Sequence, residues 1–140
     1  EKMEGKKNIV VGLFVMASFM LYGFLLIYLR DFAPGAAEWA ASYGNGKHFE
    51  ARLAHVHGNL FAFLNILIGY LLFKLDIDEM KRKIVSWTGV VGLLMPIGIV
   101  LELVLSAPPI FVILGATSMT ASVFLLAFFV MKSSKVVRSN

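Results

Sequence analysis

Two histidines two residues apart, His55 and His57, begin a long apolar stretch and are the residues best suited to chemistry. On a helix, residues two apart are rotated by about 200°, so the two imidazoles point to opposite faces and cannot hold one metal ion together. Either one alone can act as the axial ligand of haem iron, because a single imidazole is enough to hold the metal. We therefore take His55 and His57 as the candidate metal ligands.

Polar residues near these histidines could line the same site. Arg52 and Asn59 share a helix face with His55 by three- and four-residue spacing, whereas Phe61 shares the opposite face with His57. We expect Arg52 and Asn59, together with the histidines, to bind a cofactor. Asn59 is also a catalytic candidate, although interhelical hydrogen bonding is an equally ordinary role for Asn59 and for Asn65 further along the helix.

Glu102 is the one acidic residue inside any apolar stretch of the sequence. An ionisable group at membrane depth is costly unless it has a partner, so such a residue is a functional candidate by default. Glu102 lies about one turn from the end of its stretch, as do His55 and His57, and we expect these groups at one depth. Glu102 is thus the second catalytic candidate. The alternatives are an ion pair between Glu102 and Arg52, histidines that only hydrogen-bond at the interface, or a metal site that combines Glu102 with a histidine.

Composition decides the class of protein that must position these residues. Of the 140 residues, 59% are hydrophobic and only 16% are charged, with a mean hydropathy of +0.79, which is far more apolar than a soluble domain of this length. The absence of cysteine excludes disulfides, thiolate metal sites and covalent c-type haem attachment. The net charge of +4 comes from short basic clusters beside apolar runs, which indicates membrane topology rather than nucleic-acid binding.

The apolar runs predict an all-α, integral membrane four-helix bundle in which residues 1–140 form one domain. A span needs about 20 apolar residues, and the four spans are predicted at about 9–29, 53–73, 84–105 and 110–131. The first span is long and lacks a small-residue exit, so we expect it to be retained rather than cleaved as a signal peptide. Pro96 predicts a kink in the third span. The outer loop, 30–52, contains a stretch around Trp39 that could form a short interfacial helix.

Lysine and arginine counts predict the orientation. Ten of the thirteen lie at the two termini and between the second and third spans: Lys2, Lys6, Lys7, Lys74, Lys81, Arg82, Lys83, Lys132, Lys135 and Arg138. Arg30, Lys47 and Arg52 lie on the other side. The positive-inside rule therefore predicts a multi-pass protein of the cytoplasmic (inner) membrane, with both termini in the cytoplasm (N-in/C-in). Beyond Ser18, Asn65 and Pro96, we expect few polar or irregular positions in the inner two thirds of the bundle.

Several short motifs resemble the styrene oxide isomerase family. They are Glu38-Trp39 in the outer loop, Ala51-Arg52-Leu53-Ala54-His55 at the entry to the second span, Gly58-Asn59 after it, and Ala107-Pro108 after the third span. The family consists of small four-helix membrane proteins that bind haem b through one histidine of this segment, and its ferric iron promotes rearrangement of an epoxide to an aldehyde. Either His55 or His57 could take the ligand's role. Glu102 stands near the position of a family tyrosine that helps to hold the substrate, so the resemblance implies haem binding more directly than isomerase activity.

Two hypotheses of function follow. In the first, the chain is a haem-b-binding membrane protein with one axial histidine near the outer surface, which could act as an isomerase-like, Lewis-acid enzyme. In the second, it is a non-enzymatic accessory subunit of a larger membrane complex of respiratory or photosynthetic type. Both imply the lipid bilayer and either further copies of the chain or a membrane complex as partners, and no nucleic acid. Proton or ion movement is a weaker alternative, because no polar residues continue inward past Asn65.

Overall fold

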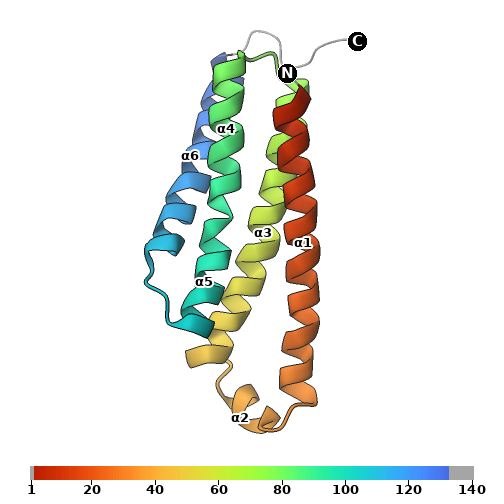
Figure 1. Cartoon of the computed structure of the whole chain (residues 1–140), viewed down its shortest axis with the longest axis vertical. Coiled ribbons are helices and arrows are strands. Elements are labelled where there is room, and N and C mark those ends of the chain that lie inside the picture. Colours follow the sequence, from red (N-terminus) through yellow and green to blue (C-terminus); the bar gives the residue numbers. More distant parts are fainter. Residues whose placement is uncertain (1, 133–140) are drawn as a thin grey trace.

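The computed structural model describes residues 2–132, and every regular element in that range is a helix, as the sequence predicts (Figure 1). The helices are α1 (Lys2–Asp31), α2 (Ala36–Ala41), α3 (Gly46–Lys74), α4 (Glu79–Gly92), α5 (Leu94–Leu105) and α6 (Ile110–Lys132). The basic residues Lys135 and Arg138 of the tail lie outside the described residues.

Four helical segments are long and apolar enough to cross a membrane: Met3–Asp31, Gly46–Lys74, Glu79–Leu105 and Ile110–Lys132. The four long apolar helices that the sequence predicts are therefore present. Each of the first three extends beyond its predicted apolar run, and α3 begins seven residues before residue 53. The predicted loop 30–52 is therefore too long, because its last residues already belong to α3. The short helix predicted around Trp39 is present as α2.

The third span bends at its centre. Helix α4 ends at Gly92 and α5 begins at Leu94, so the break lies just before Pro96. Proline has no N–H, and its ring crowds the carbonyl four residues earlier, which is that of Gly92. The interruption expected at Pro96 is thus present. It lies beside Gly92 because the proline has no N–H to donate to the Gly92 carbonyl.

Helix α3 lies in the middle of the bundle, between α1 on one side and α4 with α5 on the other, and α6 packs on the far side of α4 and α5 (Figure 1). Helices α1 and α3 approach closely because small residues meet at their contact. A Cβ added to Gly5 would lie 2.7 Å from the carbonyl oxygen of Gly69, and one added to Gly12 would lie 2.8 Å from that of Ala62. Such small-residue contacts let helix backbones come together in a membrane without a hydrophobic driving force.

A buried polar network joins α1, α3 and α4 in the half of the bundle that holds both termini of the described chain. The Asn8 amide donates to the side-chain oxygen of Asn65 at 2.9 Å and to the carbonyl of Ser86 at 3.0 Å, and Asn65 donates to the carbonyl of Gly89 at 2.9 Å. Asn8, Asn65 and Ser86 are completely buried. The interhelical role predicted for Asn65 is confirmed. The sequence does not predict the parts of Asn8 and Ser86 in this network, because Asn8 precedes the first apolar run and Ser86 is a single hydroxyl in the third.

Candidate functional site

His55 joins α3 to α1. Its Nδ1 lies 2.9 Å from the carbonyl oxygen of Phe19, and its ring rests on the backbone of Gly23, where an added Cβ would lie 2.6 Å from the imidazole Cε1. The ring of Tyr22 lies beside it, with 6.2 Å between centroids. His55 therefore sits in the close contact between two helices, and Gly23 is the residue that makes room for it.

Asn59 and Arg52 lie on the His55 side of α3, but neither reaches into the bundle. The Asn59 amide donates to the His55 carbonyl at 2.9 Å, so the prediction that Asn59 bonds another helix is wrong. The Arg52 guanidinium lies 3.5 Å from the centroid of the Tyr43 ring and donates to the Tyr43 carbonyl at 3.1 Å. Arg52 is thereby held against the loop between α2 and α3 by a cation–π contact and a hydrogen bond.

His57 takes a different direction, as the two-residue spacing predicts. Its Nδ1 lies 2.9 Å from the carbonyl of Leu53 one turn earlier in the same helix, and the edge of its ring meets Phe61 at 6.2 Å. With the proton on Nδ1, the lone pair is on Nε2, which has no hydrogen-bond partner among the described residues. His57 is half-buried and does not join α3 to a second helix.

Glu102 has no ion pair within the described chain. Its Oε1 is buried without a hydrogen-bond partner, as is the hydroxyl of Tyr22. The expected pair with Arg52 is therefore not formed. The bond between Asn65 and Gly89 fixes the register of the antiparallel α3 and α4–α5, and from it Glu102 lies about level with Arg52, roughly five residues or 7 Å from the level of His57. The expected equal depth of Glu102 and the histidines is only approximate.

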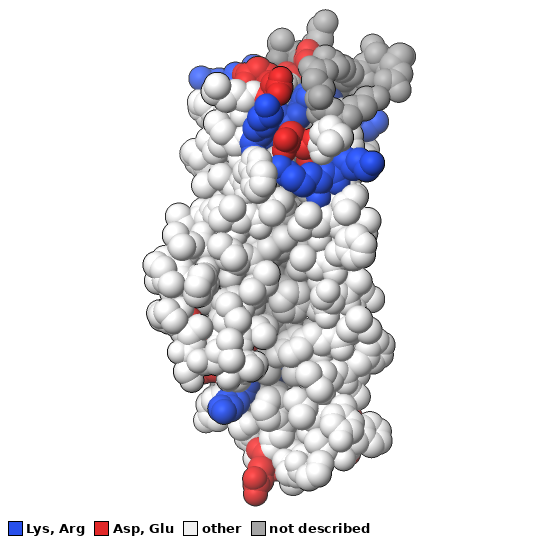
Figure 2. Space-filling model, viewed as in Figure 1, with Lys and Arg blue, Asp and Glu red and all other residues white. Residues whose placement is uncertain are grey.

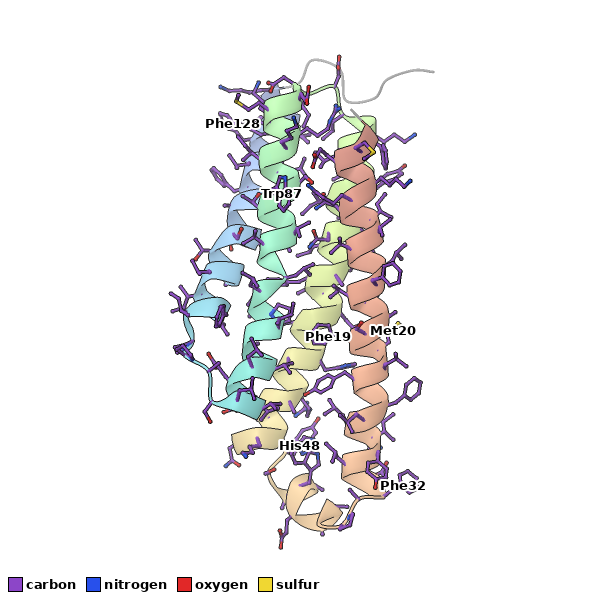
Figure 3. The ribbon with its side chains drawn as sticks, viewed as in Figure 1. Phe19, Met20, Phe32, His48, Trp87 and Phe128 are labelled. Atoms are coloured by element: carbon purple, nitrogen blue, oxygen red, sulfur yellow. The ribbon has the colours of Figure 1, made fainter. Side chains whose placement is uncertain are left out.

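The third histidine, His48, lies in the first turn of α3 and faces α2. It is buried, its Nδ1 lies 2.7 Å from the Trp39 carbonyl, and its ring stacks on the Trp39 indole at 4.8 Å between centroids (Figure 3 labels His48). The edge of Tyr43 closes the other side. His48 therefore holds α2 against the start of α3, a role that its position in a loop sequence does not reveal.

Two grooves open between helices on the surface of the bundle. The first, of about 220 Å³, lies between α1 and α5 and is lined by Ser18, Phe19, Tyr22, Ile97 and Val100. The second, of about 420 Å³, lies between α3 and α6, with Leu64, Ile68 and Leu71 as part of its α3 wall. Because residues three and four apart share a helix face, His57 and Phe61 lie on the α3 face that continues into this second groove.

The described residues contain no group of three histidine or acidic side chains that could hold a metal ion. A zinc-type site, which needs three or four protein ligands, is therefore not assembled within the described chain. No family model, curated protein or solved structure matches the chain.

Proposed function

We propose that this chain is a multi-pass protein of the cytoplasmic membrane that binds haem b through one axial imidazole, and that His57 is the ligand. The N-in/C-in orientation is supported by charge. Lysine and arginine gather at one end of the bundle, which we call the basic end, and the middle is almost free of them (Figure 2). In the described chain the basic end holds Lys6, Lys7, Lys74, Lys81, Arg82, Lys83 and Lys132. Segments rich in lysine and arginine stay in the cytoplasm.

The observation that carries the haem assignment is the hydrogen bond from His57 to its own helix. A ligating histidine usually donates its second ring N–H to a carbonyl or carboxylate, which fixes the tautomer and raises the basicity of the ligating nitrogen. The Leu53 carbonyl supplies this partner to Nδ1, and Nε2 is left with its lone pair. The donor set of His57 therefore fits an axial ligand.

His55 fits this role less well. Its Nδ1 is also bound, but its ring is pressed against Gly23 of α1, so that an added Cβ would lie 3.3 Å from Nε2 as well as close to Cε1. The His55 ring is therefore crowded on the side of α1, which the His57 ring is not. Asn59 and Arg52, both on the His55 side, are correspondingly remote from a ligand held by His57.

Haem iron held by one axial imidazole supplies a Lewis-acid or ligand-binding centre. This chain's own residues would hold the proton on Nδ1 through Leu53, fix the ring through Phe61, and offer the apolar face of α3 to the macrocycle. The isomerase-like reaction implied by the resemblance is the activity to test once haem is bound, with an aryl epoxide as substrate and the aldehyde as product.

The test is the absorption spectrum of the full chain, purified in mild detergent from cells supplied with haem precursor. We expect a Soret band that is lost in His57→Ala. The band should be kept in His55→Ala and His48→Ala, the matched controls in which another imidazole is removed. His57→Gly should recover the band when free imidazole is added, because imidazole can occupy the vacated position. A colourless wild-type protein, or a Soret band that survives His57→Ala, refutes the assignment.

The accessory-subunit function has one observation in its favour. In the most apolar stretch of 18 residues in α1, only 11% of the residues are buried. The large side chains of Phe14, Leu21 and Phe24 are each about two thirds or more exposed. A partner helix could cover this face. Co-purification of stoichiometric partners with a haem-free chain would favour this function over the first.

A further inference from the structure

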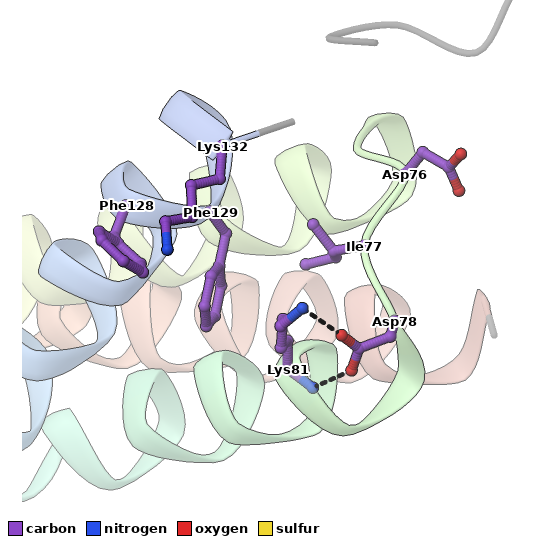
Figure 4. A pocket seen from close by; sticks show the side chains of 7 residues that line it. All are labelled: Asp76, Ile77, Asp78, Lys81, Phe128, Phe129 and Lys132. Atoms are coloured by element: carbon purple, nitrogen blue, oxygen red, sulfur yellow. Dashed lines mark hydrogen bonds and ion pairs between the residues drawn. The ribbon is translucent and has the colours of Figure 1, made fainter. Parts of the chain in front are cut away.

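A pocket of about 240 Å³ opens at the basic end, between the loop that precedes α4 and the last turn of α6 (Figure 4). Its apolar walls include Phe128 and Phe129 of α6 and Ile77 of the loop, and its charged groups are Lys81, Lys132, Asp76 and Asp78. It is separate from the histidines and from both interhelical grooves.

Charge in this pocket is arranged in two parts. On the α4 side, Lys81 Nζ lies 2.5 Å from Asp78 Oδ2, and the Asp78 side chain also accepts from the Lys81 backbone N–H at 3.0 Å. On the α6 side, Lys132 Nζ lies 4.4 Å from the centroid of the Phe128 ring and has no carboxylate partner among the described residues. Lys132 therefore presents a positive charge beside an aromatic wall.

The position of the pocket restricts what can fill it. It lies where the apolar length of α6 ends at Lys132 and the polar start of α4 begins, which is the level of the lipid headgroups for a helix that spans the bilayer. A ligand at this level must offer a charged group to Lys132 and an apolar part to the phenylalanines. A membrane phospholipid has both parts and is present at high concentration.

The carboxylate of Asp78 restricts the headgroup further. A second negative charge on the ligand would meet Asp78 on the α4 side, whereas a primary ammonium could donate to it; the carboxylate of Asp76 points away from the phenylalanines (Figure 4). A carboxylate accepts several hydrogen bonds at once, so the bonds that Asp78 already accepts from Lys81 do not prevent this. A trimethylated amine carries no N–H and could not donate.

We propose that this pocket binds the headgroup of phosphatidylethanolamine, with the phosphate on the Lys132 ammonium and the amine on the Asp78 side. The apolar start of the lipid lies against Phe128 and Phe129. This site does not depend on haem binding and remains in a chain that lacks His57.

Native mass spectrometry of the purified full chain tests this proposal, with phosphatidylethanolamine, phosphatidylglycerol and phosphatidylcholine added one at a time. We expect more adducts with phosphatidylethanolamine than with either other lipid, and at least a fivefold loss of these adducts in Lys132→Gln. Lys47→Gln, the same substitution at the opposite end of the bundle, should bind as the wild type does. Lys132→Arg keeps the charge and should keep the lipid, which separates loss of the site from loss of the fold.

Any of three results would overturn the proposal. The first is wild-type binding of phosphatidylethanolamine by Lys132→Gln. The second is equal binding of phosphatidylglycerol by the wild type, because that lipid has no amine for the carboxylate to recognise. The third is displacement of the lipid by inorganic phosphate at an equal concentration, because the apolar walls would then contribute nothing to binding.

Discussion

Asn65 and Asn59 lie six residues apart in the same helix, and the structure gives them opposite energetic roles. Asn65 is completely buried and makes two bonds to other helices, one from Asn8 and one to Gly89. Asn59 is half-buried, and its only polar contacts within the described chain are with His55 of its own helix, the carbonyl at 2.9 Å and the ring Nδ1 at 3.5 Å. Comparing Asn65→Ala with Asn59→Ala therefore measures how much interhelical hydrogen bonding contributes to the free energy of unfolding.

The expected magnitude follows from the bonds lost. Interhelical side-chain bonds in membrane proteins contribute about 0.6 kcal/mol each on average and at most about 1.7, so the two bonds of Asn65 are worth roughly 1 to 3 kcal/mol. Alanine has a higher helix propensity than asparagine by about 0.6 kcal/mol, but this gain is common to both substitutions. Asn65→Ala should therefore lower the free energy of unfolding by at least about 1 kcal/mol more than Asn59→Ala.

Reversible unfolding by SDS in mixed micelles, followed by helical circular dichroism, measures this difference. A double-mutant cycle with Asn8→Ala should show a coupling of about 0.5 kcal/mol or more, because the two amides are bonded directly. If Asn59→Ala costs as much as Asn65→Ala, or if Asn8 and Asn65 are uncoupled, then the buried network does not hold the helices together in the way described.

Three further predictions concern single contacts. Gly58→Ala should lower stability by about 1 to 3 kcal/mol, because the added Cβ would lie 2.3 Å from the ring of Phe19; thermal unfolding should show no comparable change for Gly44→Ala, whose added Cβ meets nothing within 4 Å. The ion pair and backbone bond with Lys81 lower the pKa of Asp78, so its stabilising effect should be complete near neutral pH. That effect should fall below the ordinary aspartate value of about 3.9 and vanish once the native carboxylate is protonated; Asp78→Ala should thus differ from the wild type in unfolding scans at pH 7 and match it at pH 2. His48→Ala should free α2 from α3, which faster hydrogen exchange of residues 36–45 would show and an unchanged exchange rate would contradict.

The sequence predicts the four spans, the short helix around Trp39 and the break before Pro96 because these features depend on local properties. An apolar run of sufficient length has to form a helix in a bilayer, and a proline removes one particular hydrogen bond wherever it stands. The opposite directions of His55 and His57 are predictable for the same reason, since helix rotation alone determines them.

Contacts between helices are not predictable in this way. The depth of Glu102 and the partner of Arg52 depend on the register between α3 and α5, and the network of Asn8, Asn65 and Ser86 depends on how three helices meet. A single amide such as Asn8, placed just before an apolar run, gives no indication in the sequence that it will be buried. Glycines at Gly5 and Gly69 could have indicated the close approach of α1 and α3, because both lie where small residues recur in their helices.

Nδ1 of every histidine in the chain donates to a backbone carbonyl. His48 donates to Trp39, His55 to Phe19 and His57 to Leu53. The two nitrogens of each ring therefore have different roles, since one makes the contact within the fold and the other does not. Because Nδ1 of each ring donates to a carbonyl, Nε2 is the nitrogen whose lone pair is left for a further ligand in the neutral imidazole. A ligand bound at Nε2 of His57 would thus leave the hydrogen bond between its Nδ1 and the Leu53 carbonyl in place.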